Sequence, residues 1–310
     1  MTDNALQQML STQLRELRRK RDPLRLGILL PDDNTIFVEA LWTHLEAKWF
    51  EPILILRERF SEVIRASLSD DSQFKLSIGT GEKADVQDEA ARLIREKKLD
   101  LIVLPPGQGW DITERMQRCC GDVLPPGVAG FALSRPSLLD RPLMLGDLYA
   151  DTTGGSDRLA QVARLGGELL RSVGVETPRV ALLAAVETVS EGIPATVVAR
   201  ETEESLAGSE KLHVQGPLSM DLAISVHAAE KKKVTGEVAG KADLLIGPNL
   251  TVSRGVFHAM TCLCEEPSAM VVAGGSIPFA LSGKCEGPMG VVLSTLFAGI
   301  LASSTTSSVY

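Results

Sequence analysis

The chain has 310 residues, with 32 basic and 40 acidic side chains and a formal net charge of −8 at neutral pH. Hydrophobic residues make up 44% of the sequence, which excludes a largely disordered chain, and the length predicts about two domains. The acidic balance argues against a general nucleic-acid-binding protein.

The first predicted element is an amphipathic helix over residues 3–21, in which leucines recur at helical spacing. It ends in the basic run Arg18-Arg19-Lys20-Arg21 before Pro23. This run fits either a nucleic-acid or membrane contact or, as we favour, cations placed at a helix C-terminus. The N-terminus lacks the layout of a signal peptide, and no apolar run reaches the roughly 18 residues of a membrane-spanning helix. We therefore expect a cytoplasmic protein.

Short apolar runs alternate with helical patterns along the rest of the chain. Strand–helix alternation predicts an α/β fold with mostly parallel sheets, in which ligands bind at the carboxyl ends of strands. Helical spacing predicts helices over 84–98 and 155–173. The predicted strands are 26–30, 52–56, 75–78, 101–104, 143–145, 180–184, 212–214, 244–246 and 270–272.

Common motifs for metals and nucleotides are missing from the sequence. The five cysteines include Cys119-Cys120 and Cys262-x-Cys264, but no Cys-x-x-Cys pair occurs with a matching second pair or a His pair. We therefore expect buried, reduced thiols and no metal site. The phosphate-binding loop G-x-x-x-x-G-K-[ST] does not occur, and Gly79-Thr80-Gly81 lacks the third glycine of a dinucleotide fingerprint. These absences disfavour a P-loop enzyme and a standard dinucleotide-binding dehydrogenase.

Several motifs follow one another in the second half of the chain. They include Gly216-Pro217-Leu218 with Asp221, Val238-Ala239-Gly240 with Asp243, Gly274 with Ile277-Pro278, and Leu281-Ser282-Gly283-Lys284. In order and spacing, residues 178–302 resemble the phosphate acetyl/butyryltransferase family, nearest its phosphate butyryltransferase branch. Over residues 24–147 only Asp140-Arg141 with Asp147 resembles a family segment.

The resemblance implies two α/β domains with mostly parallel sheets and an interdomain cleft, an architecture like that of isocitrate and isopropylmalate dehydrogenases. We expect an N-terminal helix over 1–22, a first domain over 23–147 plus 276–310, and a second domain over 148–275. The family resemblance also implies a homodimer that needs no metal or prosthetic group.

The implied reaction transfers a short-chain acyl group between coenzyme A, a substrate, and inorganic phosphate: acyl-CoA + phosphate = acyl phosphate + CoA. Such a site needs a deprotonated thiol, donors for an oxyanion and cations for phosphate. The family's Ser-Arg pair aligns with Gly283-Lys284, so Lys284 is expected to bind phosphate, with Ser282 as a substitute hydroxyl. Glu286 and His258 are the candidates for the base.

Further residues are candidates for binding phosphate or CoA, and each has a structural alternative. Arg141 can instead pair with Asp140 or Asp147, Glu187 and Asp221 can cap helices, and the run Lys231–Lys233 can be a solvated face. The full set expected to bind substrate or CoA is Arg115, Arg141, Glu187, Asp221, Asn249 and Arg254.

Two other functions remain open at this point. The altered Ser-Arg pair, together with the missing aspartate of the acetyl branch, is also what a catalytically impaired family member would show. Such a protein would bind CoA or an acyl metabolite as a regulatory subunit. Related phosphate-handling enzymes with this fold act on hydroxy acids with NAD, but the absence of a nicotinamide fingerprint disfavours that reaction here.

Overall fold

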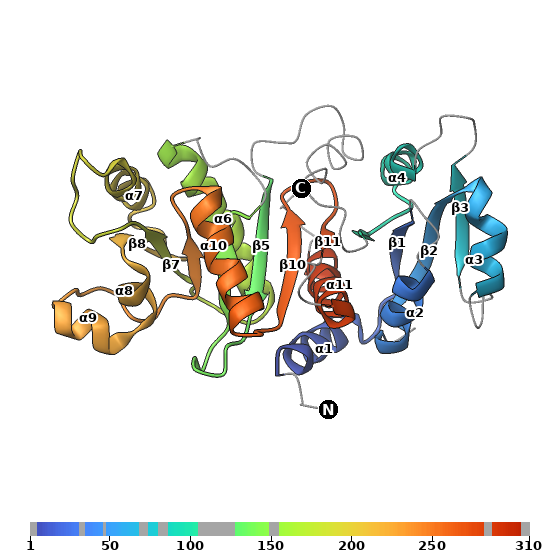
Figure 1. Ribbon diagram of the computed structural model, residues 1–310, viewed down its shortest axis with the longest axis horizontal. Coiled ribbons are helices and arrows are strands. Elements are labelled where there is room, and N and C mark those ends of the chain that lie inside the picture. Colours follow the sequence, from blue (N-terminus) through green and yellow to red (C-terminus); the bar gives the residue numbers. More distant parts are fainter. Residues whose placement is uncertain are drawn as a thin grey trace. The chain divides into compact units, whose positions relative to one another are not determined.

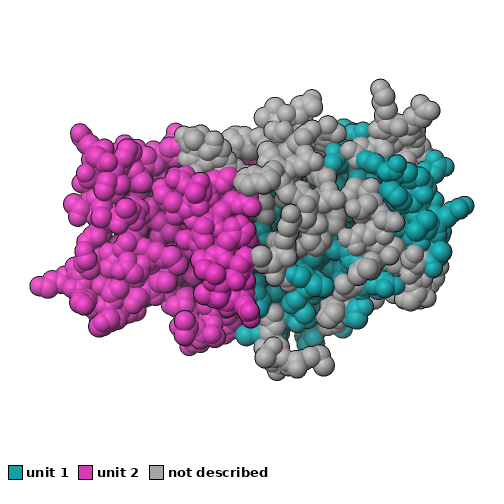
Figure 2. Space-filling model, viewed as in Figure 1, with its two compact units in different colours: residues 1–125, 267–310 teal, residues 126–266 magenta. Residues whose placement is uncertain are grey.

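A computed structural model describes residues 5–30, 35–45, 48–67, 74–79, 86–104, 128–148, 155–281 and 287–304. Its contacts divide the chain into two compact units, coloured separately in Figure 2. Unit 1 is Met1–Pro125 with Pro267–Tyr310, and unit 2 is Pro126–Glu266. Each unit is built on a mostly parallel sheet, so the α/β class expected from the sequence is confirmed.

The sheet of unit 1 has the strand order β3-β2-β1-β4-β11-β10 (Figure 1). Its strands are parallel except for β10, which is antiparallel to β11. The strands are β1 (Leu24–Leu30), β2 (Phe50–Arg57), β3 (Lys75–Gly79), β4 (Leu101–Val103), β10 (Ser268–Ala273) and β11 (Phe279–Leu281). The helices are α1 (Ala5–Arg18), α2 (Thr35–His44), α3 (Ser61–Ser67), α4 (Val86–Arg95) and α11 (Gly287–Ser304).

Helix α11 is the core helix of unit 1. It packs against α1, α2, β4, β10 and β11, and most of its side chains are buried. By length and composition alone this helix could cross a membrane, which corrects the expectation that no segment reaches that length. Ser294, Thr295 and Ser303 interrupt the apolar run, and their hydroxyls donate to carbonyls of the preceding turn. Burial inside the unit explains why α11 is so apolar.

The sheet of unit 2 has the strand order β5-β6-β9-β7-β8. Strands β6, β9, β7 and β8 are parallel, and β5 is antiparallel to β6. They are β5 (Ala129–Ser134), β6 (Leu143–Gly146), β7 (Arg179–Leu183), β8 (His213–Leu218) and β9 (Leu244–Ile246). The helices are α6 (Gly155–Ser172), α7 (Pro194–Ser205), α8 (Met220–Ile224), α9 (Val226–Lys232) and α10 (Leu250–His258).

The strands expected from apolar runs are all present, each within a few residues of its expected bounds. Sequence analysis missed two others, β5, which is rich in small residues, and β11, which follows Pro278 and includes Ala280. The sequence analysis placed the domain changes at 147/148 and 275/276. The contacts instead divide the chain next to Pro126 and Pro267, since β5 and β6 pair within unit 2 and β10 pairs within unit 1.

The same polar clamp holds the amino ends of neighbouring strands in both units. In unit 1, Asp100 Oδ2 accepts from the backbone N–H and the Nε–H of Arg25, at 2.7 and 3.0 Å. In unit 2, Asp243 Oδ2 accepts from the same two groups of Arg179, at 3.0 and 2.8 Å. The aspartate backbone N–H returns a hydrogen bond to the arginine carbonyl in each case. We call these pairs the unit 1 clamp and the unit 2 clamp.

Candidate functional site

The carboxyl ends of the parallel strands in unit 2 form one edge of its sheet. The chain leaves this edge after Gly146, Leu183, Leu218 and Ile246, and helices α7, α8 and α10 begin soon after three of these strands. Backbone N–H groups at helix N-termini favour anions, and ligands of open α/β sheets bind at this edge. We call it the carboxyl edge of unit 2.

Charged side chains from three segments meet at this edge. Lys232, the last residue of α9, has its Nζ 3.0 Å from Oε1 of Glu187, which lies in the loop after β7. Asp221 lies in the first turn of α8 and accepts a 2.6 Å hydrogen bond from the hydroxyl of Ser219. The negative charge of Asp221 acts to raise the pKa of Glu187, and the positive charge of Lys232 acts to lower the pKa of Asp221. The fold therefore brings Glu187, Asp221 and Lys232 together, two of which are predicted site residues.

Both carboxyl groups of this cluster are held in the ionised form. The pKa of Glu187 is lowered by its own backbone N–H and by the ammonium of Lys232. The pKa of Asp221 is lowered by the hydroxyl of Ser219. A general base works best with a pKa near the working pH, so these groups suit ligand positioning better than proton removal.

Helix α10 begins at the same edge, and Asn249 caps it. The side chain of Asn249 accepts from the backbone N–H of Val252 at 3.0 Å, so this candidate has a structural role in the described chain. Gly247 permits the tight turn before the helix, since a Cβ there would lie 2.5 Å from the Ser253 hydroxyl oxygen. That hydroxyl donates to the carbonyl of Gly146 and fixes α10 against β6.

The other two candidates on α10 lie farther along the helix. Arg254 is half-buried and lies just over one turn from the helix start. His258 is the last residue of α10, about 12 Å from its start at 1.5 Å per residue. Its ring is exposed and lies beside Phe257, with 5.2 Å between ring centroids. Within unit 2 the fold therefore does not bring His258 to the carboxyl edge.

Arg141 lies at the opposite edge of the same sheet. Its Nε donates to the carbonyl of Ala242 at 3.1 Å and lies 3.7 Å from Asp243 Oδ1, in the unit 2 clamp. Its partner is thus neither of the aspartates considered from the sequence, because Asp147 is buried and paired with Arg158. Burial lowers the pKa of the Arg141 guanidinium. The fold does not place Arg141 with Glu187 or Asp221.

Four predicted residues lie outside the part of the chain that the structure describes. Arg115 falls in 105–127, and Ser282, Lys284 and Glu286 fall in 282–286. The last three follow β11 directly in the sequence, and β11 runs parallel to β4, so they come after a carboxyl end of the unit 1 sheet. Their roles remain predictions.

Sequence reasoning missed part of the carboxyl edge of unit 2. It did not single out Ser219, although a serine directly after a strand and before an acidic helix turn is a recurrent polar anchor. It considered Lys232 only as one of three consecutive lysines. It also overlooked an apolar rim of partly exposed side chains after β7, β8 and β9, formed by Val186, Val189, Met220 and Val252.

No metal site is apparent among the residues that are described. No group of three or more His, Cys, Asp or Glu side chains gathers there. Cys262 and Cys264 form no disulfide and are exposed, so the expectation of buried thiols is wrong for these two. They follow α10 in a π-helical turn over Ala259–Leu263 and just beyond it, which turns their side chains to solvent.

The family described as phosphate acetyl/butaryl transferase matches residues 126–265, which are nearly the whole of unit 2. The phosphate butyryltransferase of Clostridium acetobutylicum is 30% identical over 167 residues, 53% of this chain and 56% of that protein. The chain spans about half the length of the curated relatives it matches.

Two solved structures share the fold. A branched-chain phosphotransacylase from Enterococcus faecalis has a TM-score of 0.75 at 20% identity, over 90% of this chain and 99% of that one. A 4-hydroxythreonine-4-phosphate dehydrogenase from Klebsiella pneumoniae has a TM-score of 0.51 at 11% identity, over 90% and 99%. The dehydrogenase-like α/β architecture expected from the sequence is thereby confirmed. The family resemblance is confirmed too: residues 126–265 match the phosphate acetyl/butaryl transferase family.

Proposed function

We propose that this chain catalyses acyl transfer between coenzyme A and inorganic phosphate, with the carboxyl edge of unit 2 as part of its active site. The proposal rests on where the charged cluster lies. The segment that matches the family also gathers Glu187, Asp221 and Lys232 at the edge where α/β sheets bind ligands.

The reaction determines what the chain's residues have to do. The CoA thiolate attacks the carbonyl carbon of the acyl phosphate, the C–S bond forms, and phosphate leaves with the electrons of the C–O bond. Positive charge on Lys284 would hold the phosphate and stabilise the oxyanion, and the hydroxyl of Ser282 would donate to it. Lysine lacks the bidentate geometry of arginine, so we expect weaker phosphate binding than an arginine would give.

The two carboxylates have a different role in this proposal. Ionised Glu187 and Asp221 repel phosphate. We therefore propose that they accept hydrogen bonds from the N–H and O–H groups of the CoA molecule. Lys232, held by Glu187, is positioned for one of the CoA phosphates. The start of α10, whose first turn has no acidic residue, is a second place where an anionic group is favoured.

The apolar rim supports a short-chain acyl group as the transferred group. Val186, Val189, Met220 and Val252 expose between 36% and 45% of their surface after β7, β8 and β9. Aliphatic side chains of this kind favour a short-chain acyl group over acetyl alone, at about 0.8 kcal/mol per buried methylene. We further propose a cytoplasmic homodimer, on the family resemblance alone.

The competing proposal is a family member that binds CoA without turnover. The altered Ser-Arg pair favours it, because Gly283 and Lys284 stand where the family has serine and arginine.

The experiment measures phosphate-dependent release of CoA from acetyl-, propionyl- and butyryl-CoA, alongside CoA binding by calorimetry. We expect turnover, faster with butyryl- than with acetyl-CoA, and a loss of at least tenfold in Lys284→Ala. Lys241→Ala is the matched control, because that exposed lysine lies at the opposite edge of unit 2. Tight CoA binding without turnover of any thioester would replace the enzyme with the binding protein.

A further inference from the structure

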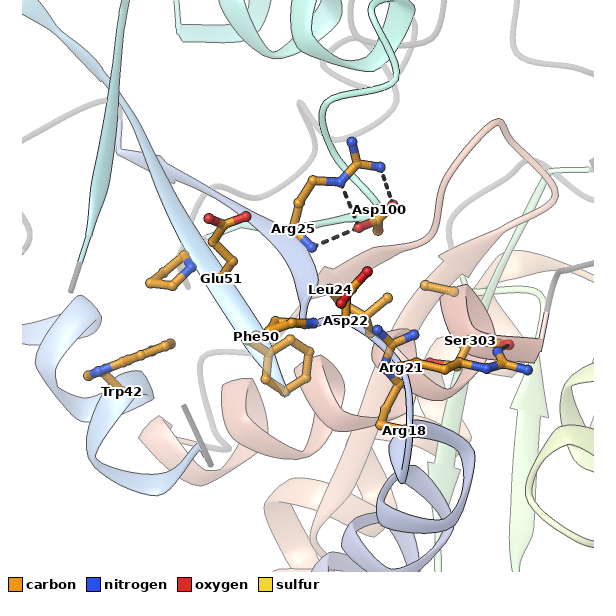
Figure 3. Close-up of a pocket in the computed structure, with 13 residues that line it drawn as sticks. Arg18, Arg21, Asp22, Leu24, Arg25, Trp42, Phe50, Glu51, Asp100 and Ser303 are labelled. Atoms are coloured by element: carbon orange, nitrogen blue, oxygen red, sulfur yellow. Dashed lines mark hydrogen bonds and ion pairs between the residues drawn. The ribbon is translucent and has the colours of Figure 1, made fainter. Parts of the chain in front are cut away.

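Unit 1 contains a hollow of about 990 Å³ at the amino ends of β1 and β2 (Figure 3). Its walls come from the end of α1, the end of α11, α2 and the first residues of both strands. The volume lies within the range of sites that bind small organic molecules. The hollow is therefore large enough for a ligand of the size of a nucleotide or a sugar phosphate.

Two arginines from the basic run after α1 line this hollow. Arg21 Nη1 donates to the carbonyl of Ser303 at 2.8 Å, which leaves its other guanidinium donors for other acceptors. The Nε–H of Arg18 is buried and has no acceptor among the described residues. Burial and the neighbouring charge of Arg21 lower the pKa of the Arg18 guanidinium, so the two cations lie close together.

The acidic residues in the walls are largely neutralised by partners of their own. Asp100 is engaged with Arg25 in the unit 1 clamp, where the two side chains lie 2.6 Å apart. Glu51 pairs with Lys75 of β3. Asp100 and Asp22 both act on Arg18 from the walls of the hollow, but Asp100 is already bound by Arg25, which leaves Asp22 as the acid whose main effect is on the arginines of the basic run.

On the opposite side of the hollow lie the aromatic ring of Trp42 and the side chain of Glu51, which pairs with Lys75. Figure 3 shows Trp42 on the left and the guanidinium groups of Arg18 and Arg21 on the right, with Phe50 between them. A ligand that satisfies both sides has an anionic head and a flat apolar part. Two adjacent guanidinium groups match the double negative charge and multiple oxygens of a phosphate monoester better than a single carboxylate.

We propose that this hollow is a binding site for a small organic phosphate, with the phosphate on Arg18 and Arg21 and the apolar part against Trp42. It is distinct from the proposed active site. The hollow lies at the amino ends of β1 and β2, whereas Ser282 and Lys284 follow the carboxyl end of β11 in the same parallel sheet. A ligand bound here would therefore not be the transferred substrate.

The test titrates phenyl phosphate into the full chain and follows both heat and tryptophan fluorescence, since Trp42 lines the hollow. We expect binding to one site, competition by excess inorganic phosphate, and no binding of phenol. Arg18→Gln should weaken binding about tenfold or more, because one charged hydrogen-bonding partner is lost. Arg19→Gln, an exposed neighbour outside the hollow, is the matched control and should bind like wild type.

Phosphate binding at the proposed active site has to be distinguished from this site. Lys284→Ala should retain the fluorescence response, and Trp42→Phe should abolish that response while the heat of binding persists. Equal affinity in wild type and Arg18→Gln, an equal loss in Arg19→Gln, or loss in Lys284→Ala alone would overturn the proposal. Thermal unfolding of each variant shows that weakened binding does not reflect unfolding.

Discussion

The two clamps have the same hydrogen-bond geometry but different surroundings. In unit 2 the side chain of Asp243 is 2% exposed and faces a second arginine, Arg141. In unit 1 the side chain of Asp100 is 28% exposed. A buried charge depends more strongly on its partner than one that water reaches. The same motif should therefore contribute more to stability in unit 2 than in unit 1.

Asp243→Asn should have the largest effect on stability. The substitution leaves the guanidinium groups of Arg179 and Arg141 beside a neutral amide in a buried place, and we expect a loss of about 3 kcal/mol of unfolding free energy. Denaturant unfolding measures it, with Asp221→Asn, an exposed aspartate of the same unit, as control. A loss no greater than in the control would mean that the clamp does not stabilise the unit.

Asp100→Asn should cost about 1–2 kcal/mol, because solvent screens the remaining guanidinium of Arg25. Burial acts to raise the pKa of Asp100, but hydrogen bonds from Arg25 outweigh it and lower the pKa below its ordinary value. The contribution is thus complete above the unfolded-state pKa of about 4 and is lost as the pH falls through the lower folded-state pKa.

Unfolding at a series of pH values tests the sign of this effect. Wild type should lose stability as the pH falls below about 4, and Asp100→Asn should show a shallower decline. Equal slopes in the two proteins would show that the clamp carboxylate is not the group responsible.

Arg141→Gln distinguishes the two edges of unit 2. Because its guanidinium binds the carbonyl of Ala242 at the amino edge, we expect a loss of about 1 kcal/mol in stability and a KM for phosphate within about twofold of wild type. Steady-state kinetics and denaturation provide both values. A KM for phosphate raised tenfold in a stable variant would restore the substrate-binding role expected from the sequence.

Lys232→Gln should have the smallest effect on stability. Its side chain is 61% exposed, and solvated ion pairs add little to folding, so the melting temperature should stay within about 1 °C of wild type. Its KM for CoA should rise if the cluster binds CoA. A drop of several degrees would instead make the pair with Glu187 a structural element.

The sequence predicted the strands well because a buried parallel strand is a short continuous apolar run, as in β1 and β9. It could not predict the clamps, since Arg179 and Asp243 are 64 residues apart and each resembles an ordinary charged residue at a strand start. The ion pair of Glu187 and Lys232 spans 45 residues for the same reason. Motif order identified the family, but the position of each side chain depends on which loops the sheet brings together.

In this proposal the carboxyl edge of unit 2 takes part in the reaction, while the clamps only stabilise the fold. The most direct test is kcat/KM for phosphate-dependent CoA release in Asp221→Asn and Asp100→Asn, at a temperature where both are folded. We expect a loss of about tenfold or more in Asp221→Asn and a change within about twofold in Asp100→Asn. Full activity in Asp221→Asn with a large loss in Asp100→Asn would instead place the unit 1 clamp, and not the carboxyl edge of unit 2, in the reaction.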